Sequence, residues 1–189
     1  MDQFTRQSTP AHFLRTVRED PKRRGLLYAG TEHGLYVSFN DGASWQSLRL
    51  NLPDTPVHGI VVEERDLVIG THGRGFYVLD NIGVLRQATP AITTTNLHVF
   101  DTFNPLRGRD RNVTVDYYLG RAADEVKVEF LDAGGTVLRT FTGTTATAAA
   151  PDADGDNPFA PRPPRVGVAK GMNRFTWDMR YEGSVVFPG

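Results

Sequence analysis

The chain has 189 residues, no cysteine and a net charge of −1 from 21 basic and 22 acidic residues. Balanced charge excludes strong electrostatic attraction to nucleic acid, and no apolar run reaches the roughly 20 residues that span a bilayer. The lack of cysteine excludes disulfides, cysteine-ligated metals and thiol catalysis. We therefore expect no nucleic-acid partner, no membrane insertion and no cofactor.

The first twenty residues are polar and mixed, with residues 11–17 as a short strand or a helical turn. Residues 1–6 hold no apolar core, so we expect no secretory signal there, and the compartment is left open. The basic segment PKRRG at 21–25 contacts a polyanion or forms a solvated turn, and the solvated turn is favoured because nothing nearby adds positive charge.

The most informative feature is an internal repeat. LYAGTEHGLYV at 27–37 returns as LVIGTHGRGFYV at 67–78, with one residue inserted in the turn. Each copy is typical of a β-hairpin, since a short apolar strand is followed by a glycine-rich turn and a strand rich in aromatic and β-branched residues. A period near 40 residues is that of one four-stranded propeller blade. The repeat therefore predicts one to two propeller blades.

A tight turn is predicted directly after the first copy, at SFNDGASW in 38–45. The segment fits the Asp-box pattern Ser-x-Asp-x-Gly-x-Thr-Trp through Ser38, Asn40, Gly42, Ser44 and Trp45. Asn40 stands where the pattern usually has Asp, but an amide oxygen still accepts bonds from backbone amides. Gly42 supplies the left-handed position and Trp45 packs beneath the loop. We expect a structural role for these five residues.

The composition and the hydropathy pattern of the chain change after residue 87. The Pro- and Thr-rich segment 88–95 is predicted to be a linker between a unit at 1–87 and a second unit at 96–189. Residues 112–119 and 125–132 alternate apolar and polar side chains, residues 136–141 follow a glycine turn, and 173–179 resume as a strand. This pattern predicts an antiparallel β-sandwich. Residues 143–165 hold almost no large apolar side chains and predict a mobile loop.

These motifs resemble a known family. Residues 23–85 are similar to the last propeller repeats of large bacterial sortilin-type BNR (Asp-box) proteins, many of which carry the label glycosyl hydrolase. GMNRFTWDMRY at 171–181 resembles the Ig-like module that follows the propeller in those proteins. The resemblance implies an all-β fold of terminal blades and an Ig-like sandwich, incomplete at one edge. It also implies that the parent protein is exported to the periplasm or the cell exterior.

The glycine-rich segment 70–75 is the strongest candidate for a ligand-binding loop in the sequence. His72 and Arg74 either face a ligand, or belong to an ordinary blade turn in which Arg74 bonds a neighbouring carboxylate or carbonyl. A metal site could be formed by His33, His58 and His72 together with a glutamate at position 32. However, no pair of these histidines has the i, i+4 spacing of two ligands on one helix. The acidic run 152–157 lacks the terminal glutamate of an EF-hand. We expect no metal site.

Two functions remain. The first is a non-catalytic binding or scaffolding fragment whose ligand is a protein or a glycan. The alternative is a sialidase-like glycoside hydrolase whose active site needs the longer parent or an oligomer, because propellers close with about 4–8 blades and two cannot surround a sugar. A truncated product without activity is a third interpretation. Unpaired strand edges at both units favour homo-oligomers. No residue of this chain alone is expected to be catalytic.

Overall fold

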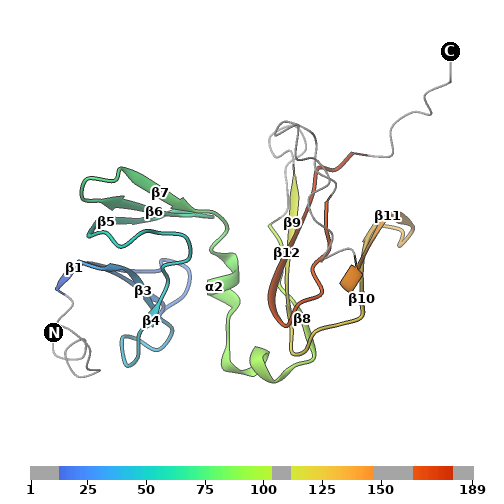
Figure 1. Cartoon of the computed structure of the whole chain (residues 1–189), viewed down its shortest axis with the longest axis horizontal. Coiled ribbons are helices and arrows are strands. Elements are labelled where there is room, and N and C mark those ends of the chain that lie inside the picture. The colour runs from blue at the N-terminus through green and yellow to red at the C-terminus, as the bar shows by residue number, and fades with distance from the viewer. Residues whose placement is uncertain (1–12, 104–111, 147–163, 181–189) are drawn as a thin grey trace, which may run out of the picture. The chain divides into compact units, whose positions relative to one another are not determined.

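The structure is a computed structural model that describes residues 13–103, 112–146 and 164–180. Most of its ordered elements are strands in small antiparallel sheets, which confirms the all-β prediction (Figure 1). The chain divides into two compact units, Met1–Arg86 and Gln87–Gly189, which we call unit 1 and unit 2. The acidic run 152–157 and most of the expected loop at 143–165 lie outside the described residues.

Unit 1 begins with a four-stranded antiparallel meander, which we call sheet 1. Each strand pairs with the next one in the chain, and the β1–β2 pair shifts register between Leu14 and Thr16. The segment that could have been a strand or a helical turn contributes to β1, and a basic turn at 21–25 leads into β2. The strands are β1 (Leu14–Glu19), β2 (Leu27–Thr31), β3 (Gly34–Ser38) and β4 (Gln46–Ser47).

A three-stranded meander, sheet 2, follows in unit 1. Its order is β5-β6-β7, and β6 begins at the position where the sequence repeat places it, forty residues after β2. The strands are β5 (Val57–Val62), β6 (Leu67–Thr71) and β7 (Phe76–Leu79).

The two sheets of unit 1 pack face to face, with β5 against β1 and β2 (Figure 1). Gly30 marks the closest approach, because a Cβ atom there would lie 2.6 Å from the carbonyl oxygen of Val57. Side chains from both sheets fill the space between them and exclude water. The fully or nearly fully buried members of this core are Leu26, Tyr28, Leu35, Val37, Leu52, Val57, Ile60, Leu67, Ile69 and Ile82.

A short helix, α2 (Gly83–Gln87), follows sheet 2, and a 3-10 helix, η1 (Pro90–Thr94), follows it. The expected linker at 88–95 therefore contains a helical turn with a buried Ile92. Its threonines explain the turn, since the hydroxyls of Thr93, Thr94 and Thr95 each donate to the carbonyl oxygen three residues earlier. No helix among the described residues is long and apolar enough to cross a membrane.

The described residues of unit 2 form two further antiparallel sheets. One has the strand order β12-β9-β8 and the other pairs β10 with β11. β11 reaches Thr144, so the strand continues two residues into the segment expected to be a loop, because Gly143 and Thr144 still pair with the start of β10. The strands are β8 (Leu97–Val99), β9 (Val113–Leu119), β10 (Glu125–Leu131), β11 (Val137–Thr144) and β12 (Gly171–Trp177).

Aromatic side chains join the two sheets of unit 2. Phe130 of β10 lies 4.6 Å from Trp177 of β12 between ring centroids, and Phe141 of β11 lies 4.8 Å from Phe175. Edge-on and tilted rings at such distances add to the free energy gained by burying them. Trp177 is buried and donates its indole N–H to the carbonyl of Arg180, so packing accounts for this tryptophan.

Candidate functional site

The candidate site is the end of unit 1 where both β-hairpins turn. In the first turn the hydroxyl of Thr31 donates to the carbonyl of Gly34 (3.2 Å), and in the second Thr71 donates to Gly75 (2.7 Å). The same hydrogen bond therefore closes both turns of the repeat. The second turn is one residue longer, and Gly75 takes a positive φ of 75° that favours glycine.

The connection from β4 to β5 ties the two turns together. Pro56 accepts a backbone hydrogen bond from His72 (2.9 Å), and the hydroxyl of Thr55 donates to the carbonyl of His72 (3.4 Å). Asp54, in the same connection, lies 3.1 Å from Nδ1 of His33 in the first turn. Three loops distant in sequence thus form one edge, which we call the hairpin edge.

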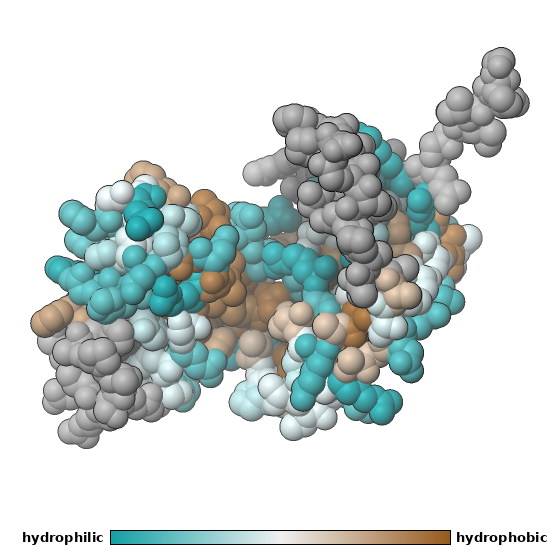
Figure 2. Space-filling view, viewed as in Figure 1, coloured by the Kyte–Doolittle hydropathy of each residue, from teal (hydrophilic) through white to brown (hydrophobic). Residues whose placement is uncertain are grey.

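Histidines and an arginine dominate the exposed surface of the hairpin edge. The rings of His58 and His72 stack with centroids 5.3 Å apart, and both side chains are exposed. Arg74 is also exposed and has no hydrogen-bond or ion-pair partner among the described residues. The structure thus brings His72 and Arg74 onto one turn and adds His58 beside them. Figure 2 shows hydrophilic side chains over much of this face of unit 1.

The carboxylates of Glu32 and Asp54 at the hairpin edge each contact a basic side chain. Glu32 accepts a hydrogen bond from Arg15, and Asp54 is held by His33. In the described parts of the chain, no group of three or more His, Cys, Asp or Glu side chains could hold a metal ion. The edge therefore offers exposed imidazoles and the guanidinium of Arg74, which suit hydrogen bonding to an anionic or strongly polar ligand.

The turn at Ser38–Trp45 lies between β3 and β4, and its polar side chains bond one another and the backbone. The hydroxyl of Ser38 donates to Oδ1 of Asn40 (3.0 Å) and accepts from the N–H of Gly42 (2.9 Å). Oδ1 of Asn40 accepts from the N–H of Ser44 (2.9 Å), and Nδ2 donates to the hydroxyl of Ser44 (2.9 Å). Gly42 is left-handed at φ 82° and faces the ring of Trp45. All five candidate residues therefore meet in one turn.

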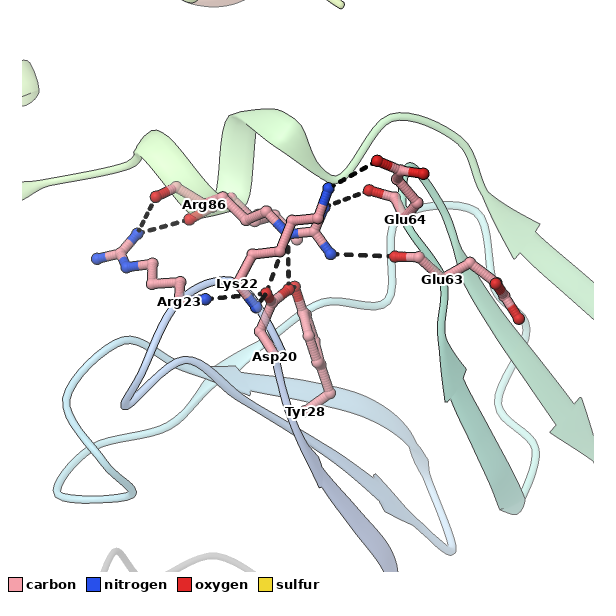
Figure 3. Close-up of polar contacts among 8 residues, drawn as sticks. Asp20, Lys22, Arg23, Tyr28, Glu63, Glu64 and Arg86 are labelled. Atoms are coloured by element: carbon pink, nitrogen blue, oxygen red, sulfur yellow. Dashed lines mark hydrogen bonds and ion pairs between the residues drawn. The ribbon is translucent and has the colours of Figure 1, made fainter.

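A buried polar cluster in unit 1 was not predicted from the sequence. The side chain of Asp20 is 0% exposed, and its Oδ1 and Oδ2 accept a bifurcated hydrogen bond from Nε of Arg86 at 3.0 and 2.9 Å (Figure 3). Backbone N–H groups of Lys22 and Arg23 donate to the same carboxylate, and so does the hydroxyl of Tyr28 (3.2 Å). We call these groups the Asp20 centre.

Arginine side chains extend the Asp20 centre to neighbouring loops. Arg86 donates to the carbonyl oxygens of Glu63 (3.0 Å) and Glu64, which connect β5 to β6. Arg23 donates to the carbonyl oxygens of Leu85 (2.6 Å) and Arg86 (3.1 Å) at the end of α2. The centre thus joins sheet 1, sheet 2 and α2 (Figure 3). It is buried and fully bonded, so we assign it to stability rather than to binding.

Tyr28 should make unit 1 sensitive to alkali. Burial, followed by the charge and the hydrogen bond of Asp20, raises the pKa of Tyr28 above its usual value. In the unfolded chain the phenol ionises near pH 10, so this contribution to stability is complete below that pH and is lost as pH rises further. Tyr28→Phe should therefore flatten the loss of stability above about pH 10, measured by urea unfolding across the pH range. Tyr36→Phe on the same sheet is the matched control, and an equal change there would contradict the prediction.

Unit 2 has its own buried carboxylate. Asp116 of β9 accepts from Nε (2.7 Å) and Nη2 (3.3 Å) of Arg174, its cross-strand partner in β12. The hydroxyl of Tyr117 donates to the carbonyl of Gly167 (2.6 Å), which ties the segment before β12 to the sheet. Both contacts join segments far apart in sequence, and both serve the fold of unit 2.

No family model, no curated protein and no solved structure matches this chain. The function is therefore inferred from the geometry of the hairpin edge together with the sequence motifs.

Proposed function

We propose that this chain is a non-catalytic binding or scaffolding module of a sortilin-type Asp-box propeller protein, with a protein or a glycan as its ligand. Two successive antiparallel meanders that repeat after forty residues support neighbouring blades. The bonded turn at 38–45 supports an Asp-box. The aromatic core between the sheets of unit 2 supports an Ig-like sandwich.

The observation that carries the binding role is the hairpin edge. Its loops are held by hydrogen bonds, while His72 and Arg74 on the second turn and His58 at the start of β5 remain exposed. Loops fixed on a rigid sheet are where binding residues are commonly found, because little ordering is needed when the ligand arrives. A guanidinium beside stacked imidazoles suits a ligand carboxylate or sulfate, as acidic glycans and acidic peptides present.

The same edge does not support glycoside hydrolysis by this chain alone. That reaction needs two carboxyl groups on either side of the scissile bond. Glu32 and Asp54 are instead bound by Arg15 and His33. A hydrolase would therefore need groups from other parts of a larger protein.

Arg74→Ala should weaken ligand binding by about 10- to 100-fold, because a hydrogen bond to a charged group contributes about 1.5–3 kcal/mol. The measurement is a titration with sialylated and sulfated glycans and with acidic peptides, followed by hydrolysis assays on the glycans that bind. Arg121→Ala, which removes an exposed arginine of unit 2, is the control. An equal loss with Arg121→Ala would overturn the site, and turnover of any glycan would overturn the non-catalytic role.

A further inference from the structure

The stacked imidazoles of His58 and His72 are available to a ligand at the hairpin edge. Their ring planes meet at 27° with centroids 5.3 Å apart, and one ring comes from β5 while the other comes from the turn after β6. Among the described residues, neither ring has a hydrogen-bond or ion-pair partner. The same turn leaves room for a ligand, because a Cβ atom added at Gly73 or Gly75 would meet no described atom within 4 Å.

The charged groups around the pair leave it without an anion. On the elements beside it, the groups that carry or gain a charge between about pH 5 and 8 are Arg15, Glu32, His33, Arg49, Asp54 and Arg74. Arg15 binds Glu32. Nδ1 of His33 lies 3.1 Å from a carboxylate oxygen of Asp54. No carboxylate of this set is therefore left for the stacked pair, and Arg74 adds a positive charge on the same turn as His72.

This arrangement couples the binding of protons to the binding of anions. Histidine is the side chain whose charge ordinarily changes between about pH 5 and 8. Two protonated rings would have their centroids only 5.3 Å apart, on the same edge as the guanidinium of Arg74, and such like charges repel one another. An anion bound by both rings offsets this repulsion. The anion therefore binds more tightly in acid, and its binding brings protons onto the rings.

We propose that the His58–His72 pair makes the hairpin edge an acid-dependent site for a sulfate ester, which the edge binds below about pH 6.5 and releases above it. Because the pair belongs to the hairpin edge, this property rests on the binding role proposed above. A sulfate ester stays ionised throughout this range and has several terminal oxygens, which suit hydrogen bonds from both imidazolium groups and from Arg74 together. A planar carboxylate is instead matched by a single guanidinium fork.

The first test measures the affinity for a sulfated oligosaccharide and for a sulfotyrosine peptide from about pH 8 to about pH 5.5 at constant ionic strength. The wild type should bind one of them about tenfold more tightly at the acid end, because two donors become charged there, and the probe that binds identifies the source of the sulfate. His58→Gln and His72→Gln should each lose most of this gain, and both side chains are exposed, so the variants should fold. His98→Gln removes a histidine of unit 2 and should keep the gain, which excludes an effect of net charge. A gain that His58→Gln and His72→Gln both retain would overturn the proposal.

The second test separates the acid dependence from the binding role itself. Calorimetric titrations near pH 6.5 in buffers of different ionisation enthalpy measure the protons taken up with the bound probe. The wild type should take up protons, and the double variant of His58→Gln and His72→Gln should take up almost none. Arg74→Ala should weaken binding at every pH and keep the uptake. Binding by the wild type without proton uptake would overturn the acid dependence alone. No binding of either probe would overturn the sulfate site, and the sialylated glycans and acidic peptides titrated above then test the binding role separately.

Discussion

Arg86→Ala should lower the stability of unit 1 by about 3–5 kcal/mol, the usual cost of removing one partner from a buried ion pair. Asp20 would stay buried without the guanidinium of Arg86, because the side chain of Asp20 is 0% exposed and the side chain of Arg86 is only 10% exposed. The variant also loses the hydrogen bonds that hold the β5–β6 connection through Glu63 and Glu64. Sheet 1 and sheet 2 would then be joined mainly by their apolar core.

Hydrogen exchange measured by mass spectrometry can check this result, because it reports on each unit separately. Protection should fall throughout β1, β2, β5 and β6 and stay unchanged in β10 and β11. Glu64→Gln removes the exposed ion pair of Glu64 with Lys22 and should leave protection nearly unchanged. Arg86→Lys should recover only part of the loss, since an ammonium cannot reproduce the planar fork of guanidinium donors. If Arg86→Ala behaves as Glu64→Gln does, the Asp20 centre does not stabilise unit 1.

Local sequence patterns predicted the strands well. The glycine-rich turns and the repeat at 27–37 and 67–78 correspond to β2–β3 and β6–β7, and alternation at 112–119 and 125–132 corresponds to β9 and β10. These signals depend on neighbours in sequence, because a hairpin turn and a period of two are properties of short segments. The side-chain bonds of the turn at 38–45 are equally local.

The Asp20 centre could not be predicted in the same way. Asp20 and Arg86 are separated by 66 residues, and nothing in the local sequence pairs one of 22 acidic side chains with one of 21 basic ones. The hairpin edge was predicted in part, since His72 and Arg74 were identified as candidate binding residues in a glycine-rich turn. His58 joins them only because β5 runs beside β6, a contact that depends on the register of the folded sheet.

Gly30→Ala should destabilise unit 1 by about 1–3 kcal/mol, as expected when an atom is forced into a closely packed site. The new Cβ would lie 2.6 Å from the carbonyl oxygen of Val57 and 2.8 Å from its side chain. Backbone atoms of β5 cannot move aside without disturbing the packing of one sheet on the other. Urea unfolding followed by the fluorescence of Trp45 in a Trp177→Phe background measures the change in unit 1.

Gly70→Ala is the matched control, because the repeat places Gly70 where Gly30 stands in sheet 1. Its Cβ would meet only the ring of Phe76 at 3.5 Å, an ordinary van der Waals contact. The substitution should therefore be neutral, or stabilising by about 0.5 kcal/mol because alanine loses less conformational entropy in a strand. Equal destabilisation by both substitutions would show that the close approach of Val57 to Gly30 is not the cause. A large difference would show that the same sequence position is constrained only where a second sheet packs against it.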